Sequence, residues 1–173
     1  KLDEKVSNLS DRVEKLLSTA DNGRLMKEGI STVIVGKPNA GKSSLLNIMV
    51  GEERAIVTDI AGTTRDVLQE SIKLHGIGLN IIDTAGIRTT EDVVEKIGVE
   101  KAKKYANEAD LILYVVDASV ALDDSDREII TLLEDKNVII LLNKSDLTAA
   151  VEESDLIQVI DELVPGHKKI EMI

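Results

Sequence analysis

Four short apolar runs constrain the fold of this chain more than any other feature. They cover residues 32–35, 79–82, 111–116 and 138–142, and β-branched side chains are frequent in them. Such runs are typical of strands buried on both faces of a parallel sheet. Candidate helices follow them at residues 42–50, 93–108, 124–134 and 152–164. This alternation predicts an α/β fold of three layers, with functional residues beyond the carboxyl ends of the strands.

One edge of the sheet is expected to be antiparallel. Apolar and polar residues alternate across residues 69–74, and the sequence His-Gly-Ile-Gly at residues 75–78 leads into the run at 79–82. This pattern predicts two strands joined by a short hairpin. Residues 168–173 favour a final strand. We therefore expect a mostly parallel sheet with one antiparallel edge strand.

An amphipathic helix precedes the first strand. Its apolar stripe recurs at three- and four-residue steps and consists of Val6, Leu9, Val13, Leu16 and Leu17. We expect residues 1–28 to form a helical appendage and residues 29–173 to form the main domain. The pattern leaves open whether the helix packs on this domain or needs another neighbour. The charged opening at Lys1 resembles neither a signal peptide nor a natural start, so we expect an excised piece.

Composition excludes several classes of function. Lysine and arginine total 21 against 32 aspartate and glutamate residues, and a net charge of -11 argues against extensive nucleic-acid wrapping. The absence of cysteine excludes disulfides, thiolate metal sites and cysteine nucleophiles, and suits a reducing compartment. No apolar run approaches the length of a membrane span. We expect a cytoplasmic protein without a membrane partner.

A phosphate-binding loop is the clearest functional motif. Residues 36–43 read Gly-Lys-Pro-Asn-Ala-Gly-Lys-Ser, which matches G-x-x-x-x-G-K-[ST] between a predicted strand and a predicted helix. Backbone N–H groups and the helix N-terminus can bind phosphate oxygens, and Lys42 can reach the outer phosphates. The hydroxyl of Ser43 is a candidate magnesium ligand. A plain glycine turn is the structural alternative.

A second phosphate-sensing motif follows the next apolar run. Residues 83–86 read Asp-Thr-Ala-Gly, so that Asp83 can hold the magnesium shell and the Gly86 N–H can contact a terminal phosphate. Between the two motifs, residues 56–66 form a long polar segment that we interpret as a switch. We favour the Thr64 hydroxyl as its magnesium ligand, although Thr63 and Thr64 could also simply cap a turn.

A base-reading motif follows the last of the four runs. Residues 143–146 read Asn-Lys-Ser-Asp. Guanine presents N1–H and a 2-amino group side by side, which the Asp146 carboxylate can accept together, whereas adenine has no such pair. Lys144 would lie along the base and Asn143 would brace the loops. The motif favours GTP over ATP, and its structural alternative is a polar cap on the next helix.

In this order the motifs resemble those of the translation-factor-related GTPases, over nearly all of residues 33–146. Four segments resemble the G domain of the MnmE (TrmE) family of tRNA-modification GTPases: GKPNAGKSSLLN from Gly36, IVTDIAGTTRD from Ile56, IIDTAGIR from Ile81 and VVEKIGVEKA from Val93. Gly23, Arg24 and Leu25 ahead of the first strand agree with this resemblance. The Der family of ribosome-assembly GTPases shares two of the four segments and is the alternative.

The resemblance implies a P-loop NTPase of the Ras-like G-domain type that binds GTP and GDP with Mg²⁺ and hydrolyses GTP. It also implies a flavoprotein partner, MnmG, and work on the wobble uridine of tRNA through regions mostly outside this chain. Residues 1–28 would then be a remnant of a helical domain. A final loop that completes the guanine pocket in the family would follow Ile173.

For hydrolysis, Ile87 replaces the glutamine that orients water in the Ras-type site. Arg88, Glu91, Asp92 and Glu95 lie downstream, and spacing alone does not choose among them. The resemblance implies that Glu95 is the catalytic glutamate, that Asn39 ligates K⁺ and that two G domains dimerise during turnover.

Two functional classes remain as alternatives to a switch-type GTPase: a nucleotide-gated binding module with negligible turnover, and a P-loop kinase using ATP, which Asp146 disfavours. The expected catalytic residues are Glu95, Lys42, Thr64 and Gly86. The expected nucleotide-binding residues are Asn39, Ala40, Gly41, Lys42, Ser43, Ser44, Thr63, Asn143, Lys144 and Asp146. The expected metal ligands are Ser43, Thr64 and Asp83 for Mg²⁺ and Asn39 for K⁺.

Overall fold

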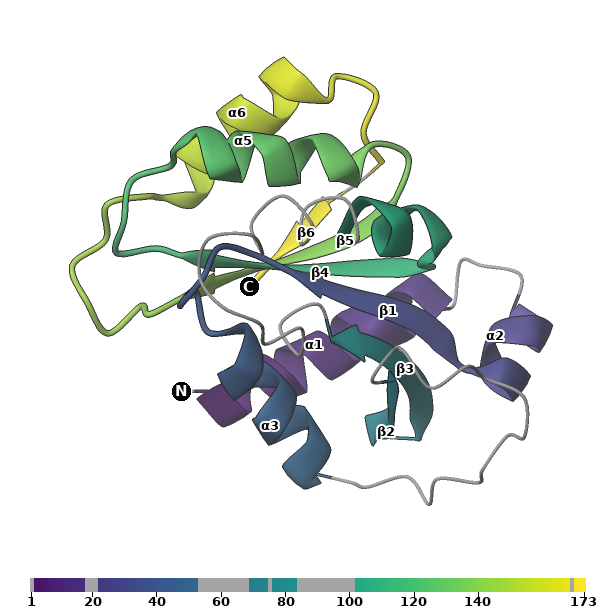
Figure 1. The fold of residues 1–173 in the computed structure, drawn as a ribbon. Helices are drawn as coiled ribbons and strands as arrows, with labels where there is room; N and C mark the ends of the chain where they lie inside the picture. Colours follow the sequence, from purple (N-terminus) through teal and green to yellow (C-terminus); the bar gives the residue numbers. More distant parts are fainter. Residues whose placement is uncertain (1, 18–21, 53–68, 75, 84–101, 169) are drawn as a thin grey trace, which may run out of the picture.

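A six-stranded sheet forms the centre of the molecule, in the order β2-β3-β1-β4-β5-β6 (Figure 1). The computed structural model describes residues 2–17, 22–52, 69–74, 76–83, 102–168 and 170–173. The strands are β1 (Ile30–Val35), β2 (Gln69–Leu74), β3 (Ile77–Asp83), β4 (Leu111–Asp117), β5 (Asn137–Asn143) and β6 (Ile170–Met172). All neighbouring strands pair in parallel except β2 and β3. The predicted α/β sheet with one antiparallel edge strand is confirmed.

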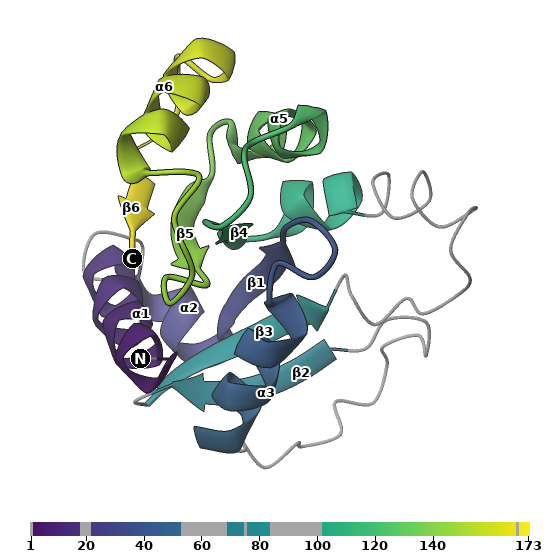
Figure 2. The same cartoon turned by 90° about the vertical axis from the view of Figure 1, so that its left-hand side faces the viewer.

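Helices cover both faces of this sheet. They are α1 (Leu2–Leu17), α2 (Asn22–Glu28), α3 (Lys42–Glu52), α5 (Asp124–Ile130) and α6 (Glu153–Leu163), together with the 3-10 turn η1 (Thr131–Leu133) and a helical segment at residues 102–108. Figures 1 and 2 show α1 and α3 on one face and α5, α6 and residues 102–108 on the other. The predicted three layers are therefore present.

Element boundaries differ from the sequence prediction in a few places. The strand β3 begins at Ile77 rather than at residue 79, because Ile77 and Gly78 pair with Leu74 and Lys73 across a turn with Gly76 at φ 87°. The predicted helix at 124–134 ends as an α-helix at Ile130 and continues as η1. The short helix α2 was not predicted, and most of the predicted helix 93–108 lies outside the described residues.

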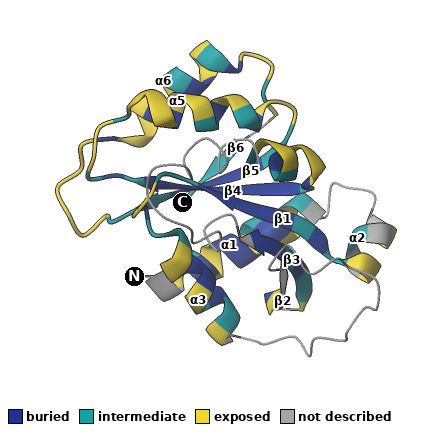
Figure 3. Ribbon diagram, in the orientation of Figure 1, coloured by how far each residue is buried: buried dark blue, intermediate teal, exposed yellow. Residues whose placement is uncertain are grey.

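The strand β4 supplies side chains to two separate cores. Leu111, Leu113 and Val115 belong to the core beneath α1 and α3, whereas Ile112, Tyr114 and Val116 belong to the core beneath α5 and α6. Figure 3 shows the central strands as the most deeply buried part of the molecule. Burial on both faces explains why the strand is apolar without alternation.

The helix α1 packs directly on the sheet. Val6, Leu9 and Val13 are no more than 1% exposed and join the core that β1, β3 and β4 supply. At the polar boundary of this contact, Arg12 pairs with Glu171 on β6 at 2.6 Å, and the Lys5 ammonium donates to the carbonyl oxygen of Leu142. Burial lowers the pKa of Lys5, and the nearby Asp146 partly offsets this effect. The question left open by the sequence is answered: α1 packs on the main domain.

Within the described ranges, no helix is both long enough and apolar enough to cross a bilayer.

Candidate functional site

The phosphate-binding loop joins β1 to α3 at the carboxyl edge of the sheet. It begins at Gly36, directly after the last residue of β1, and ends where Lys42 opens α3. The Leu45 N–H donates to the Gly41 carbonyl at 3.0 Å, so regular helical bonding begins inside the loop. A helix N-terminus directs its N–H groups and the positive end of its dipole at an anion, and α3 places these here. The motif thus lies in the context that its chemistry requires.

Two glycines of the loop are required by close packing. Gly36 has φ 153°, and a Cβ atom there would lie 2.4 Å from the carbonyl oxygen of Val115 on β4. Gly41 has φ 109°, and a Cβ atom there would lie 2.1 Å from Nδ2 of Asn143. Asn39, at φ 61°, occupies the left-handed region that asparagine tolerates better than most residues. The loop therefore lies directly against β4 and the end of β5.

The Lys42 ammonium is held over the loop. Its Nζ donates to the carbonyl oxygens of Gly36 and Lys37, each at 2.7 Å. Ala40 is buried, whereas Asn39, Ser43 and Ser44 are exposed at the loop and at the first turn of α3. Three of the predicted phosphate-contacting residues thus lie at the surface, and the two backbone carbonyls set the direction of the Lys42 charge.

The base motif contacts the phosphate loop. Asn143 ends β5, and its Nδ2 donates to the Ala40 carbonyl oxygen at 2.8 Å. This single bond joins two motifs that are 103 residues apart in sequence. Asp146 is exposed, as a carboxylate that is to meet a base must be. The structure therefore brings Asn143, Lys144 and the phosphate loop together at one edge.

Lys144 is fixed by a residue that the motifs did not include. Its Nζ lies 2.6 Å from Oδ2 of Asp117, the last residue of β4, and its backbone has φ 59°. Burial opposes the charge of Asp117, but hydrogen bonds from Lys144 and Ser119 outweigh it and lower the pKa of this carboxyl. Asp117 therefore stays ionised and holds Lys144. Its place at the end of a buried strand was a sequence signal that could have identified it.

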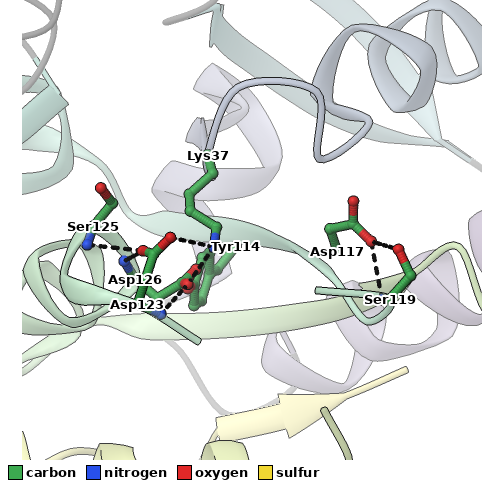
Figure 4. A network of polar contacts seen from close by, with 7 residues as sticks. All are labelled: Lys37, Tyr114, Asp117, Ser119, Asp123, Ser125 and Asp126. Carbon is green, nitrogen blue, oxygen red and sulfur yellow. Dashed lines mark hydrogen bonds and ion pairs between the residues drawn. The ribbon is translucent and has the colours of Figure 1, made fainter. Parts of the chain in front are cut away.

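A second unpredicted group surrounds Lys37, the residue after Gly36. Its Nζ lies 2.6 Å from Oδ2 of Asp126 and 3.0 Å from Oδ2 of Asp123, and the Tyr114 hydroxyl donates to Oδ1 of Asp126 at 2.9 Å (Figure 4). Burial opposes the charge of Lys37, but the two carboxylates outweigh it and raise its pKa. No sequence signal identified Asp126, because Asp-Asp-Ser-Asp reads as the solvated first turn of a helix.

Several predicted residues lie outside the described part of the chain: Thr63, Thr64, Gly86 and Glu95. Asp83 ends β3, and its backbone pairs in register with Ile34, two residues before Gly36. In the described ranges, no three His, Cys, Asp or Glu side chains gather into a metal cluster. The Ser43 hydroxyl is a donor of the kind that Mg²⁺ prefers, whereas the side chain of Asp83 lies outside the described part of the structure.

A family model of 50S ribosome-binding GTPases matches residues 31–144. Among curated proteins, the tRNA modification GTPase MnmE of Lachnoclostridium phytofermentans is 59% identical over 134 residues, which are 78% of this chain and 29% of that protein. MnmE of Alkaliphilus oremlandii is 61% identical over 122 residues, 70% of this chain and 26% of that protein. The chain thus spans under a third of the length of these relatives.

Two solved structures share this fold. A crystal structure of Era from Aquifex aeolicus bound to GDP.AlF4- has a TM-score of 0.54 and 33% identity, and the match covers 83% of this chain and 50% of that one. The G domain of FeoB from T. maritima has a TM-score of 0.52 and 25% identity, with 83% and 85% coverage. The expected resemblance and the expected Ras-like fold are both confirmed.

Proposed function

The chain belongs to the 50S ribosome-binding GTPase family and is a GTP-hydrolysing G domain, and from this premise we propose which of its residues bind and hydrolyse the nucleotide. The contact that carries the proposal is the 2.8 Å hydrogen bond from Asn143 to the Ala40 carbonyl. It places the base motif beside the phosphate loop, so that one nucleotide can span both. The phosphates lie on residues 39–44 and the guanine lies against Lys144 and Asp146.

The phosphate half of the site works by fixed positive charge. The phosphate oxygens are surrounded by backbone N–H groups, which belong to Asn39, Ala40, Gly41, Lys42, Ser43 and Ser44. The Lys42 ammonium turns from the loop carbonyls toward the outer phosphates. Thr63 adds a contact from the switch segment. Ser43, Thr64 and Asp83 hold Mg²⁺, which supplies charge neutralisation at the phosphates.

Hydrolysis requires a positioned water and compensation of developing negative charge. We assign water positioning to Glu95, with the Gly86 N–H and Thr64 sensing the terminal phosphate. Asn39 would ligate K⁺. This cation would offset the negative charge that develops in the transition state, which an arginine finger does in the Ras-type template. Two G domains pair across their switch faces during turnover.

The 53–61% identity to MnmE relatives supports tRNA modification as the setting of this GTPase. The chain would drive a conformational cycle, while an MnmG-type flavoprotein and tRNA engage regions mostly outside it, in the cytoplasm. A Der-like role in ribosome assembly is the second candidate, because the family model is described by ribosome binding. A module that uses hydrolysis only as a timer is the third.

Calorimetric titration with GDP and ADP tests the base assignment. We expect GDP to bind at least about 100-fold more tightly, because a pocket built for hydrogen bonds rejects a ligand that cannot make them. Asp146→Asn should lose GDP affinity and gain affinity for xanthosine diphosphate, since an amide mismatches guanine but can donate to the xanthine 2-oxygen. Equal binding of GDP and ADP by the wild type would refute the assignment.

Turnover measured against protein concentration tests the hydrolysis assignments. We expect the rate per molecule to rise with concentration in KCl and to stay low in NaCl. Glu95→Ala should keep GDP affinity and lose turnover in KCl by at least about tenfold. Glu91→Ala, in the same acidic segment, is the matched control. Equal rates in the two salts would remove the potassium site, and an unchanged Glu95→Ala rate would remove the catalytic glutamate.

A further inference from the structure

A segment with no nucleotide motif contacts both halves of the site. This connector, residues 117–126, runs from the last residue of β4 to the third residue of α5. We infer that the connector sets the phosphate loop and the base loop relative to each other, with Asp126 positioning the first through Lys37 and Asp117 positioning the second through Lys144. The inference rests on the nucleotide site proposed above and adds two positioning residues to it.

The phosphate end of the connector grips the loop beside the residue that binds phosphate. Lys37 lies 2.6 Å from Asp126 and 3.0 Å from Asp123 through its ammonium. The carbonyl of the same residue accepts from Lys42 Nζ at 2.7 Å. Because one residue carries both contacts, fixing the Lys37 side chain also fixes an acceptor that aims Lys42.

Burial of Asp126 makes its ion pair with Lys37 rigid. Asp126 is 1% exposed, and its carboxylate accepts from the Tyr114 hydroxyl at 2.9 Å and from the Asp123 N–H at 3.0 Å in addition to its pairing with Lys37. Tyr114 is itself fully buried. A buried carboxylate without its cation would be costly, so Lys37 has little freedom to leave. Figure 4 shows the three side chains converging from the phosphate loop, β4 and α5.

The base end of the connector is held by one ion pair and by backbone bonds. Asp117 pairs with Lys144 at 2.6 Å and accepts from the Ser119 hydroxyl at 2.6 Å. The next residue, Ala118, donates to the Asn143 carbonyl at 3.0 Å and accepts from the N–H groups of Ala150 and Val151. These bonds bracket the base loop on both sides. Asp146, two residues after Lys144, inherits its position from them.

The phosphate end is tested by GDP titration of Lys37→Met and Lys37→Arg. The Lys37 side chain is only 15% exposed, yet methionine fills a similar volume without charge, and arginine keeps both charge and donors. We expect Lys37→Met to bind GDP about tenfold more weakly, because it loses the charge-assisted contacts to Asp126 and Asp123, and Lys37→Arg to stay within about threefold of wild type. The GDP-to-IDP affinity ratio should be unchanged in both variants.

The base end is tested by the same ratio in Asp117→Asn. IDP lacks the 2-amino group, so a displaced Asp146 loses more with GDP than with IDP. We expect the GDP-to-IDP ratio to fall at least about threefold, which a general loss of stability would not cause. Arg127→Ala is the control, because it removes an exposed ion pair between α5 and Glu162 on α6 and should change neither affinity.

The outcomes separate this inference from the function it rests on. Wild-type protein that fails to prefer GDP over ADP would refute the nucleotide site itself. Wild-type protein that prefers GDP, together with Lys37→Met equal to Lys37→Arg in affinity, would overturn the phosphate end of the inference. An unchanged GDP-to-IDP ratio in Asp117→Asn would overturn the base end. Urea unfolding of every variant confirms that each affinity belongs to folded protein.

Discussion

At the scale of single residues, the site depends on a few side chains whose bonds cross long stretches of sequence. Asn143 on β5 donates a hydrogen bond to the phosphate loop, and Lys37 within the loop pairs with Asp126 on α5. Neither contact joins neighbours in sequence, and each one fixes the backbone of the phosphate loop against another element. Substitution at these points should therefore change loop geometry before it changes the core.

The surface pair of His167 and Asp161 gives a pH-dependent prediction. Nε2 of His167 lies 2.8 Å from Oδ1 of Asp161, and this bond, with one to the Lys168 carbonyl, raises the pKa of the imidazole. A raised folded pKa adds stability that is fully present below about pH 6.5 and is lost as pH rises through the folded value. His167→Gln should thus cost more at pH 5.5 than at pH 8.5.

Urea unfolding at the two pH values measures this difference, which we expect to be below about 1 kcal/mol for an exposed pair. Asp161→Asn serves as the control, because it removes the largest cause of the raised pKa and should reduce the pH dependence of the cost of His167→Gln. A cost that grows with pH would contradict the assigned direction.

At the scale of elements, α1 behaves as part of the sheet's cover. Its stripe of Val6, Leu9 and Val13 is buried in the same core as β1 and β3, and Arg12 ties its polar side to β6. The sequence predicted the helix from its periodicity but not its neighbour, because amphipathic spacing identifies an apolar face and says nothing about what covers it.

Removal of one α1 side chain should therefore destabilise the whole domain. Leu9 is 0% exposed, and Leu9→Ala should lower the free energy of unfolding by about 2–5 kcal/mol through lost burial and a cavity. Asn8→Ala changes an exposed neighbour and should stay within about 0.5 kcal/mol. Chemical denaturation followed by far-UV circular dichroism compares the two. Equal midpoints for Leu9→Ala and wild type would show that α1 is dispensable for the domain.

In the other elements too, the sequence predicted the element itself but not its tertiary partners. Continuous apolar runs predicted β1, β4 and β5 well, because burial on both faces leaves a strong compositional signal. The motifs located Lys42 and Asn143 because their spacing follows from phosphate and base chemistry. Asp126 and Tyr114 escaped prediction because their partners come from other elements, and only the tertiary fold brings them together. The place of Asp117 at the end of a buried strand marked it as a candidate, but its pairing with Lys144 follows only from the tertiary fold.

At the scale of the whole molecule, one sheet separates two cores while its carboxyl edge carries the site. Phosphate loop, connector and base loop leave β1, β4 and β5, which lie side by side in the sheet. The strand order thus explains why motifs far apart in sequence act on one nucleotide. The strand order also means that the two cores support the site from opposite faces of the sheet.

The two cores should contribute independently to a single unfolding transition. Leu9 lies in one core and Leu156, also 0% exposed, in the other. The cost of the double variant Leu9→Ala with Leu156→Ala should equal the sum of the single costs within about 0.5 kcal/mol, since the sites share no partner. Urea titration monitored with two spectroscopic probes tests both the additivity and the single transition. Two separate transitions would instead mean that the faces unfold as different units.

The contact between Tyr114 and Asp126 also has an optical consequence. The chain has two tyrosines, no tryptophan and no phenylalanine, so its ultraviolet emission arises from Tyr105 and Tyr114 alone. One of these rings donates its hydroxyl to the carboxylate that holds Lys37. A carboxylate acceptor quenches phenol emission, and the unlabelled protein thereby carries its own spectroscopic reporter of whether the phosphate loop is gripped or released.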